Sequence, residues 1–219
     1  MRKRNKAPFC LSREGGSKLN AQGTLADLAK EAIRKGATKA RIISARDVVL
    51  DARVRFKCSI PVCSGYGRNL MCPPNVISVE DFRHILSLYK HALLLQVETN
   101  FDSRDKSKEC LTEDLCREIE RRTGTARWQR NLHDLVNALE ATAFKKGYRF
   151  AAGLIGGECI LCEECVAVRG GRTCVHPFRA RPSLEAVGVD VVSTCQKAGM
   201  PIELSSRTKV RWTGLVLLD

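Results

Sequence analysis

Four cysteines lie close together in the segment GECILCEECVAVRGGRTCVHP at residues 157–177. They are Cys159, Cys162, Cys165 and Cys174, with the spacing Cys-x2-Cys-x2-Cys-x8-Cys. Neighbours in the close triplet cannot pair as unstrained disulfides, because the Cα and Cβ separations of a disulfide are narrowly set. They can surround one metal centre, and a cubane iron–sulfur cluster takes three thiolates from a tight loop and a fourth from further along. The spacing therefore predicts a [4Fe-4S] cluster.

Structural zinc is the alternative cofactor for this loop. Zinc more often takes two separated Cys-x2-Cys pairs, which makes the close triplet a better match to iron and sulfide. His176, just beyond the last cysteine, could replace a thiolate in a zinc site. Alternatively it lies near a cluster as a hydrogen-bond donor to a ligand, or packs beside Pro177.

A second set, earlier in the chain, has only three thiols. Cys58, Cys63 and Cys72 lie among glycines and prolines in CSIPVCSGYGRNLMCPP at residues 58–74. A metal centre there would lack one protein thiolate, and an iron with an open position can bind a small substrate. Tyr66 would then be a candidate acid or hydrogen-bond donor. The cysteines could instead pack in a reduced core, or take a fourth ligand from elsewhere, for which the candidates are Cys110, Cys116 and Cys195.

Arginines surround the four-cysteine loop. Arg179 and Arg181 lie in a stretch, residues 166–184, that contains no acidic residue. A cluster held by four thiolates is negatively charged, so nearby guanidinium groups would stabilise its reduced form. The same two arginines could simply fix the loop to the last helix through capping and ion pairs.

The net charge of +13 raises nucleic acid as a partner. Aromatic residues make up only 5% of the chain, and no stacking platform or helix-turn-helix signature is present. Nucleic-acid binding is therefore possible but not favoured. No apolar run approaches the roughly 20 residues that span a bilayer, and the N-terminus lacks a signal-peptide pattern. With eleven cysteines, these features predict a cytoplasmic protein without membrane association whose thiols serve metal or redox chemistry.

The elements that must position these loops follow from periodicity and capping residues. We expect a disordered basic tail at residues 1–23 and a single domain at residues 24–219. Helices are expected at residues 24–35, 78–89, 111–122, 128–146 and 183–199. Strands are expected at residues 40–44, 48–56, 91–99, 148–155 and 210–218. This order predicts an α/β or α+β fold, with one central mixed sheet flanked by helices and two cysteine-rich metal-binding loops.

Both cysteine motifs in combination carry a resemblance to a known family. RFKCSIPVCSGYGRNLMCPPN, followed by a helix and HALLL, and then GGECILCEECVAVRGGRTCVHPFRARPSLEAVGVDVVSTCQKAG closely resemble the predicted metal-binding proteins that bear domain of unknown function 2284. The resemblance covers about residues 25–203 and implies metal binding through these cysteines, without implying a reaction. The matched positions are Cys58, Cys63, Tyr66, Gly67, Cys72, Pro73, Pro74, Cys159, Cys162, Cys165, Cys174, Pro177, Arg181, Pro182, Ser183 and Glu185. The gap between Cys58 and Cys63 is one residue longer than the family pattern leads us to expect.

These observations lead to one expected function and two alternatives. We expect a cytoplasmic iron–sulfur protein with at least one [4Fe-4S] cluster, which exchanges electrons with a redox partner protein. The first alternative is an enzyme in which an open iron in the three-cysteine loop acts on a small substrate. The second is a zinc-stabilised module that binds nucleic acid or protein. Whether the two cysteine sets form one site or two, and in which oligomeric state, is left open by the sequence.

Overall fold

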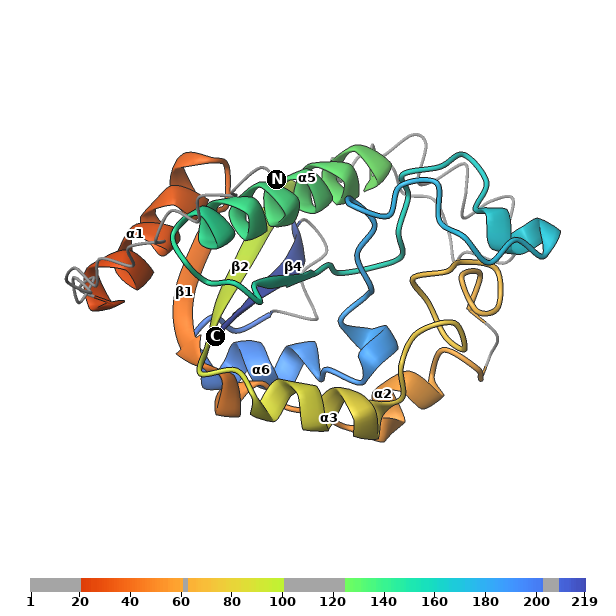
Figure 1. The fold of residues 1–219 in the computed structure, drawn as a ribbon, viewed down its shortest axis with the longest axis horizontal. Helices are drawn as coiled ribbons and strands as arrows, with labels where there is room; N and C mark the ends of the chain where they lie inside the picture. Colours follow the sequence, from red (N-terminus) through yellow and green to blue (C-terminus); the bar gives the residue numbers. More distant parts are fainter. Residues whose placement is uncertain (1–20, 61–62, 101–124, 203–208) are drawn as a thin grey trace, which may run out of the picture.

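The computed structural model describes residues 21–60, 63–100, 125–202 and 209–219. At its centre is a four-stranded sheet with the order β1-β2-β4-β3. The strands are β1 (Lys39–Ser44), β2 (His91–Asn100), β3 (Ala152–Leu154) and β4 (Lys209–Leu218). Helices lie on both faces of this sheet, which makes the architecture α+β (Figure 1).

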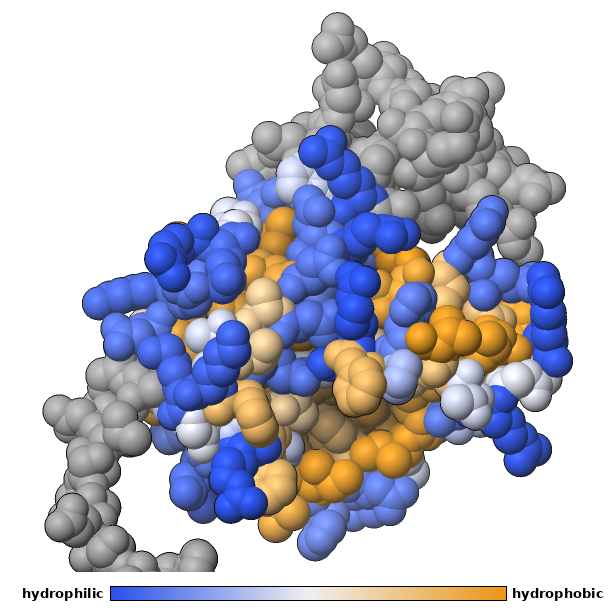
Figure 2. Space-filling view, turned by 45° about the horizontal axis from the view of Figure 1, so that its top comes forward, coloured by the Kyte–Doolittle hydropathy of each residue, from blue (hydrophilic) through white to orange (hydrophobic). Residues whose placement is uncertain are grey.

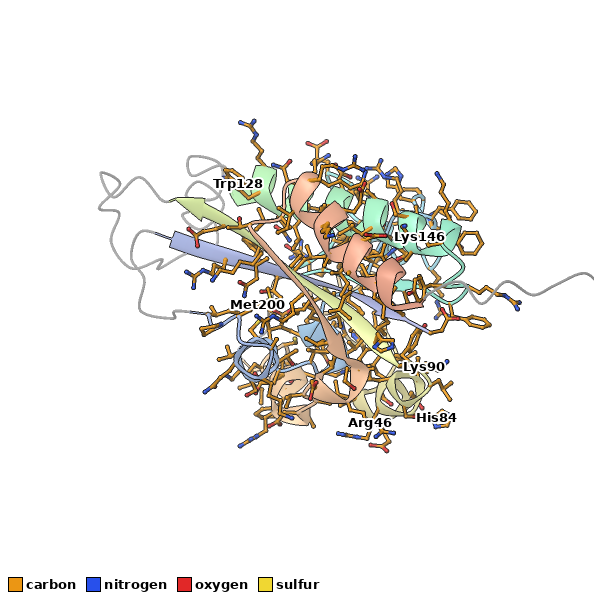
Figure 3. All side chains as sticks on the ribbon, turned by 90° about the vertical axis from the view of Figure 1, so that its left-hand side faces the viewer. Arg46, His84, Lys90, Trp128, Lys146 and Met200 are labelled. Carbon is orange, nitrogen blue, oxygen red and sulfur yellow. The ribbon has the colours of Figure 1, made fainter. Side chains whose placement is uncertain are left out.

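Two helical layers enclose the sheet. One layer is formed by α1 (Ala21–Arg34) and α5 (Thr125–Lys145), and the other by α3 (Val79–Ser87) and α6 (Val191–Lys197) (Figure 1). Shorter elements are α2 (Ala52–Phe56) and the 3-10 helices η1 (Ala45–Asp47), η2 (Val166–Arg169) and η3 (Glu185–Val187). Seen from the end of the molecule, Trp128 and Lys146 lie with the first layer, whereas Arg46 and His84 lie with the second (Figure 3). None of the helices in the described ranges combines the length and the apolar composition needed to cross a membrane.

Strand β2 is buried on both sides, as its nearly continuous apolar sequence predicted. Successive side chains of a strand point to opposite faces of the sheet. Leu93 and Leu95 accordingly pack in a cluster with Leu132 of α5, whereas Leu94 packs in a separate cluster with Phe82 of α3. The two apolar layers hold the helices against the sheet and give the cysteine loops a fixed base.

The central sheet was predicted correctly, but its expected mixed character was wrong. Every pair of strands within the described ranges is antiparallel, with β2 between β1 and β4. A parallel contact occurs as an isolated bridge between Ile155 and Ser183. Alternation of helices and strands along a sequence is compatible with either pairing, so it could not decide this point.

The strand expected at residues 48–56 was also wrong. The chain makes one bridge there, between Leu50 and Val189, and then forms helix α2. Asp51 begins this helix, because its carboxylate accepts a hydrogen bond of 2.8 Å from the backbone N–H of Arg53. A side-chain cap satisfies an N–H group that has no partner inside the helix, and this local effect outweighs the alternation of apolar and basic residues.

The long helix expected after Ser183 is divided into η3 and α6. Gly188 ends η3 with a φ of +86°, a conformation that residues with a Cβ rarely adopt. Asp190, rather than Ser183, caps α6 by accepting a hydrogen bond of 3.0 Å from the backbone N–H of Ser193. The helix expected from Thr24 begins earlier, at Ala21. The helix expected at residues 111–122 and most of the expected tail lie outside the described residues.

Both cysteine loops lie at one end of the molecule, beyond the end of the sheet (right side of Figure 1). The first loop connects α2 with α3, and the second connects β3 with η3. They come from distant parts of the chain, and the sheet with its two helical layers brings them side by side.

A core substitution tests this arrangement. Leu94 is 1% exposed at the centre of β2, and we expect Leu94→Ala to lower the free energy of unfolding by about 2–5 kcal/mol, since it removes buried methyl groups and leaves a cavity. Leu88, which is 68% exposed, is the matched control, and Leu88→Ala should change the value by no more than about 0.5 kcal/mol. Urea unfolding followed by circular dichroism measures both. Equal losses for the two variants would contradict the described core.

Candidate metal centre

The four cysteines of the second loop line one small cavity. Cys159, Cys162, Cys165 and Cys174 surround a space of about 20 Å³, and His176 contributes to the same lining. All four thiols are free and only partly buried. These four cysteines therefore lie around one common space, and their role as ligands remains a prediction.

Glycines give the loop its path. Gly157 opens it with a φ of +74°, and a Cβ at this position would lie 2.7 Å from Nε2 of Gln129 and 3.0 Å from Cζ3 of Trp212. Gly170, with a φ of +77°, ends η2, so that the chain turns back and brings Cys174 beside the other three thiols. Both turns need residues without a side chain.

The thiols of this loop repel one another when ionised. Burial raises the pKa of Cys159, and the neighbouring charges of Cys174 and Cys162 act in the same direction. The backbone N–H of Leu161 opposes this effect at Cys159. The backbone N–H of His176 donates a hydrogen bond of 3.3 Å to Cys174 Sγ. Such amide donors stabilise thiolates, and a bound cation would remove the remaining repulsion. His176 thus contacts a predicted ligand through its main chain.

The three cysteines of the first loop line a second, larger cavity. Cys58, Cys63 and Cys72 contribute to a space of about 430 Å³, and Tyr66 lies in the same lining. Cys72 is buried, with 6% of its surface exposed, whereas Cys63 is exposed. The two cysteine sets therefore border two different cavities among the described residues, rather than one common space.

Two carboxylates of the larger cavity were not expected as site residues. Glu158 and Glu185 both line it. The pKa of Cys72 is raised mainly by burial. The negative charge of Glu158 is the next largest cause and acts in the same direction. Burial also raises the pKa of Cys58, to which the charges of Cys63 and Glu185 contribute. The sequence signal for Glu158 was its position directly before Cys159, and Glu185 stood among the positions matched to the family.

Asn69 joins the two loops. Its Nδ2 donates a hydrogen bond of 2.8 Å to the carbonyl of Cys159, and its Oδ1 accepts one of 2.9 Å from the backbone N–H of Met71. The residue is 6% exposed. A buried amide with these partners fixes the first loop relative to the cysteine-bearing segment of the second.

Helix α5 holds the other side of the second loop. Gln129 Nε2 donates a hydrogen bond of 2.6 Å to the carbonyl of Glu158, and Arg130 donates one of 3.1 Å to the carbonyl of Ile160. These side chains satisfy carbonyl groups that have no strand or helix partner. The loop is consequently held in position by side chains of α5.

The arginines predicted to lie near the cofactor also contact α5. Arg181 makes a bidentate ion pair with Glu140. The Nε–Oε2 distance is 2.7 Å and the Nη2–Oε1 distance is 2.6 Å. Arg179 pairs with Asp134 at 2.9 Å. The ion-pair alternative foreseen for these residues accounts for their contacts, although the helix that they bind is α5 and not the last one. Their influence on a cluster remains a prediction.

The candidate fourth cysteines do not complete the first set within the described residues. Cys195 is 0% exposed in the core, where its sulfur contacts Gln96 Nε2 at 3.5 Å and Thr213 Oγ1 at 3.8 Å. It does not line the cavity of Cys58, Cys63 and Cys72. The other two candidates, Cys110 and Cys116, lie outside the described residues.

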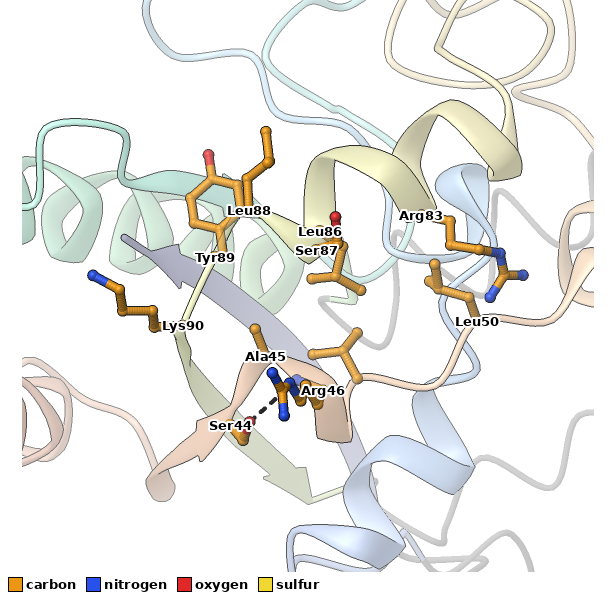
Figure 4. A pocket seen from close by; sticks show the side chains of 11 residues that line it. Ser44, Ala45, Arg46, Leu50, Arg83, Leu86, Ser87, Leu88, Tyr89 and Lys90 are labelled. Atoms are coloured by element: carbon orange, nitrogen blue, oxygen red, sulfur yellow. Dashed lines mark hydrogen bonds between the residues drawn. The ribbon is translucent and has the colours of Figure 1, made fainter.

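A separate depression of about 720 Å³ lies between η1, α3 and the start of β2 (Figure 4). Its lining includes Arg46, Arg83 and Lys90 but no cysteine, histidine or carboxylate. It therefore lacks the donors that transition metals require, and the candidate centre remains with the cysteine loops. Within the described ranges, no group of three or more Cys, His, Asp and Glu side chains is arranged so that it could hold a metal ion.

One comparison with known proteins gives a match. A family model described as "Predicted metal-binding protein (DUF2284)" matches residues 41–218, which include both cysteine loops. Searches of curated proteins and of solved structures give no match.

The bridge between the loops can be tested through Asn69. Asn69→Asp keeps the acceptor for Met71 but removes the donor to Cys159, so we expect a loss of about 1–3 kcal/mol in unfolding free energy and weaker retention of metal by the second loop. Thermal unfolding and metal content after dialysis against a chelator measure the two effects. Asn131→Asp on α5 is the control, and identical metal retention in all three proteins would contradict the bridge.

His133 gives the anchor of the second loop a pH dependence. Its Nε2 donates a hydrogen bond of 2.7 Å to the carbonyl of Arg179, and its Nδ1 has no partner among the described residues. Burial lowers the pKa of His133 below the usual 6.5, and the charge of Arg181 contributes to this. The neutral ring is therefore favoured in the folded state, so stability is fully present above pH 6.5 and is lost as the pH falls below it. Denaturant unfolding between pH 7 and pH 5 should show this loss, and a wild-type slope that His133→Gln leaves unchanged would refute the assignment.

Proposed function

Since the chain belongs to the DUF2284 family of predicted metal-binding proteins, we propose that it is a cytoplasmic iron–sulfur protein that exchanges electrons with a partner protein. The centre would be a [4Fe-4S] cluster held by Cys159, Cys162, Cys165 and Cys174. The observation that carries this proposal is the convergence of these four thiols on one small cavity. The use of cysteine throughout the chain supports the reducing compartment.

The arrangement of donors fits a cluster better than a single zinc ion. In a tetrahedral zinc site all four sulfurs must approach one ion to about 2.3 Å. In a cubane each thiolate binds a different iron, so the sulfurs stand farther apart around a shared space. The close Cys-x2-Cys-x2-Cys triplet and the shared lining of one cavity support the second arrangement. Soft thiolate donors also suit iron–sulfur chemistry.

The chain's own residues would tune such a centre. A bound cluster of this kind supplies one-electron transfer. The N–H groups of Leu161 and His176 donate to ligand sulfurs and would favour the more negative, reduced state. Partial burial of the thiols leaves an edge near solvent, as transfer to another protein requires.

Exposed apolar side chains beside the loop would provide the contact area for the redox partner. Val175 is 60% exposed and Phe178 is 90% exposed, and both lie in the segment that follows the cysteine triplet. Figure 2 shows apolar surface on the side of the molecule where the cysteine loops lie, bordered by hydrophilic side chains. Electron-transfer proteins form small, short-lived contacts, for which such a limited apolar area is adequate.

The larger cavity favours a second candidate function, an enzyme with an additional centre. Three thiols and Tyr66 border a space of about 430 Å³, which is large enough for a small molecule. A centre on Cys58, Cys63 and Cys72 would have one iron without a cysteine ligand, and Tyr66 would be placed to donate a proton to a bound substrate.

Metal analysis tests the proposed function. Protein purified without oxygen should be brown, contain about four irons per chain for one cluster or about eight for two, and show a paramagnetic signal on reduction. Cys162→Ser should lose the signal of the first centre, because one of its four ligands is removed. Cys72→Ser should leave that signal intact and remove only the second centre, if one forms.

The control variant is Ser87→Ala, at the end of α3, a residue that lines neither of the two cysteine cavities. It should retain the iron content and spectrum of the wild type. A colourless preparation that contains zinc and no iron would refute the proposal, as would iron content that is the same in the wild type, Cys162→Ser and Cys72→Ser.

A further inference from the structure

Glu158 lies between the two cysteine sets. Its side chain lines the larger cavity, with Cys58, Cys63 and Cys72. The next residue, Cys159, lines the smaller cavity of the second loop. Two consecutive residues therefore face the two candidate centres.

Gly65 shows where the carboxylate of Glu158 lies. A Cβ on Gly65 would be 2.8 Å from Glu158 Oε2 and 3.0 Å from Cys72 Sγ. Gly65 is not among the glycines with positive φ, so its backbone conformation alone does not demand glycine. A side chain at residue 65 is excluded by lack of space, because Glu158 Oε2 and Cys72 Sγ both lie close to the position that its Cβ would occupy. Glu158 is thus a direct neighbour of a predicted ligand.

The direction of the Glu158 side chain is set by its backbone. Gln129 binds the carbonyl of Glu158 at 2.6 Å, and Asn69 binds the carbonyl of Cys159 at 2.8 Å. Gly157, the preceding residue, is confined between Gln129 and Trp212. Fixing the main chain on both sides of Glu158 leaves its carboxylate directed to the larger cavity.

We propose that Glu158 supplies the fourth protein ligand of the three-cysteine centre, through a carboxylate oxygen on the iron that Cys58, Cys63 and Cys72 leave open. This inference rests on the second candidate function, in which that centre exists. An oxygen ligand is harder than a thiolate and binds such an iron less firmly, so a small substrate with an oxygen or sulfur donor could displace it. The ligand would also lie one residue from Cys159, which gives the two centres a short covalent connection.

Glu185 is the competing carboxylate. Ser183 Oγ donates a hydrogen bond of 2.5 Å to Glu185 Oε2, so this carboxylate is turned toward Ser183. Glu158 Oε2, by contrast, lies beside the same Cβ position of Gly65 as Cys72 Sγ. Glu158 is therefore the better candidate, and the two can be separated by experiment.

The test compares Glu158→Gln, Glu158→Ala and Glu158→Cys after anaerobic reconstitution of the full chain. One equivalent of ferricyanide takes one electron from a four-iron cluster that has a weakly held iron, one ferrous ion leaves, and a three-iron cluster remains. Electron paramagnetic resonance and released iron measure this conversion. We expect it to be at least about tenfold faster in Glu158→Gln and Glu158→Ala than in the wild type, and to be suppressed in Glu158→Cys, where a thiolate replaces the carboxylate.

Two further carboxylates serve as comparison. Glu163→Gln changes an exposed position of the second loop and should behave as the wild type. Glu185→Gln should also keep the wild-type rate if Glu158 is the ligand. Acceleration in Glu185→Gln alone, or wild-type rates in all Glu158 variants, would overturn the inference. Circular dichroism of the metal-free variants shows whether each is folded, and rescue by Glu158→Cys excludes a purely structural effect.

Cys72→Ser separates failure of the inference from failure of its premise. If this change does not lower the iron content, the three-cysteine centre does not form and the inference falls with the second candidate function. If Cys72→Ser removes iron while the Glu158 variants convert at the wild-type rate, the centre exists and only the role of Glu158 is wrong.

Discussion

The structure depends on how unpaired carbonyl groups of two irregular loops are satisfied. Loops that carry closely spaced ligands cannot form helix or strand over their length, and buried backbone groups without partners are costly. Here amide and guanidinium side chains take the place of a neighbouring strand: Asn69 binds Cys159, Gln129 binds Glu158 and Arg130 binds Ile160. These contacts, rather than contacts between the thiols, determine where the cysteines lie.

Charge is organised around the same segment. The loop after Cys165 is rich in arginine, yet Arg179 and Arg181 are paired with carboxylates of α5. Their charge therefore serves first to attach the loop to the helix. Glu158 and Glu185 line the larger cavity, whereas no carboxylate is in the lining of the smaller one. The two candidate centres consequently differ in polarity as well as in the number of cysteines.

Elements with an apolar pattern that extends over many residues were predicted correctly from the sequence. Predictions were wrong where a single residue determines whether a helix begins or ends. Strand β2 and helix α5 have long, consistent apolar patterns, and both were found near their expected positions. Asp51 and Gly188 each changed an element, one through a cap and the other through its backbone conformation. The convergence of the cysteines followed from spacing, because a short loop limits where its members can lie. Glu158 could not be assigned to the other cavity, since that depends on a contact between distant segments.

Trp212 adds an optical property to the second loop. Its ring borders Gly157, and its Nε1 is buried without a hydrogen-bond partner among the described residues. Indole emission depends on the surroundings of the ring and is quenched by a chromophore that absorbs at the emission wavelength. A cofactor in the cysteine loop that absorbs at this wavelength would therefore quench the tryptophan fluorescence of the protein, whereas a colourless metal ion would not. The chain thus carries a built-in reporter of what its cysteines hold.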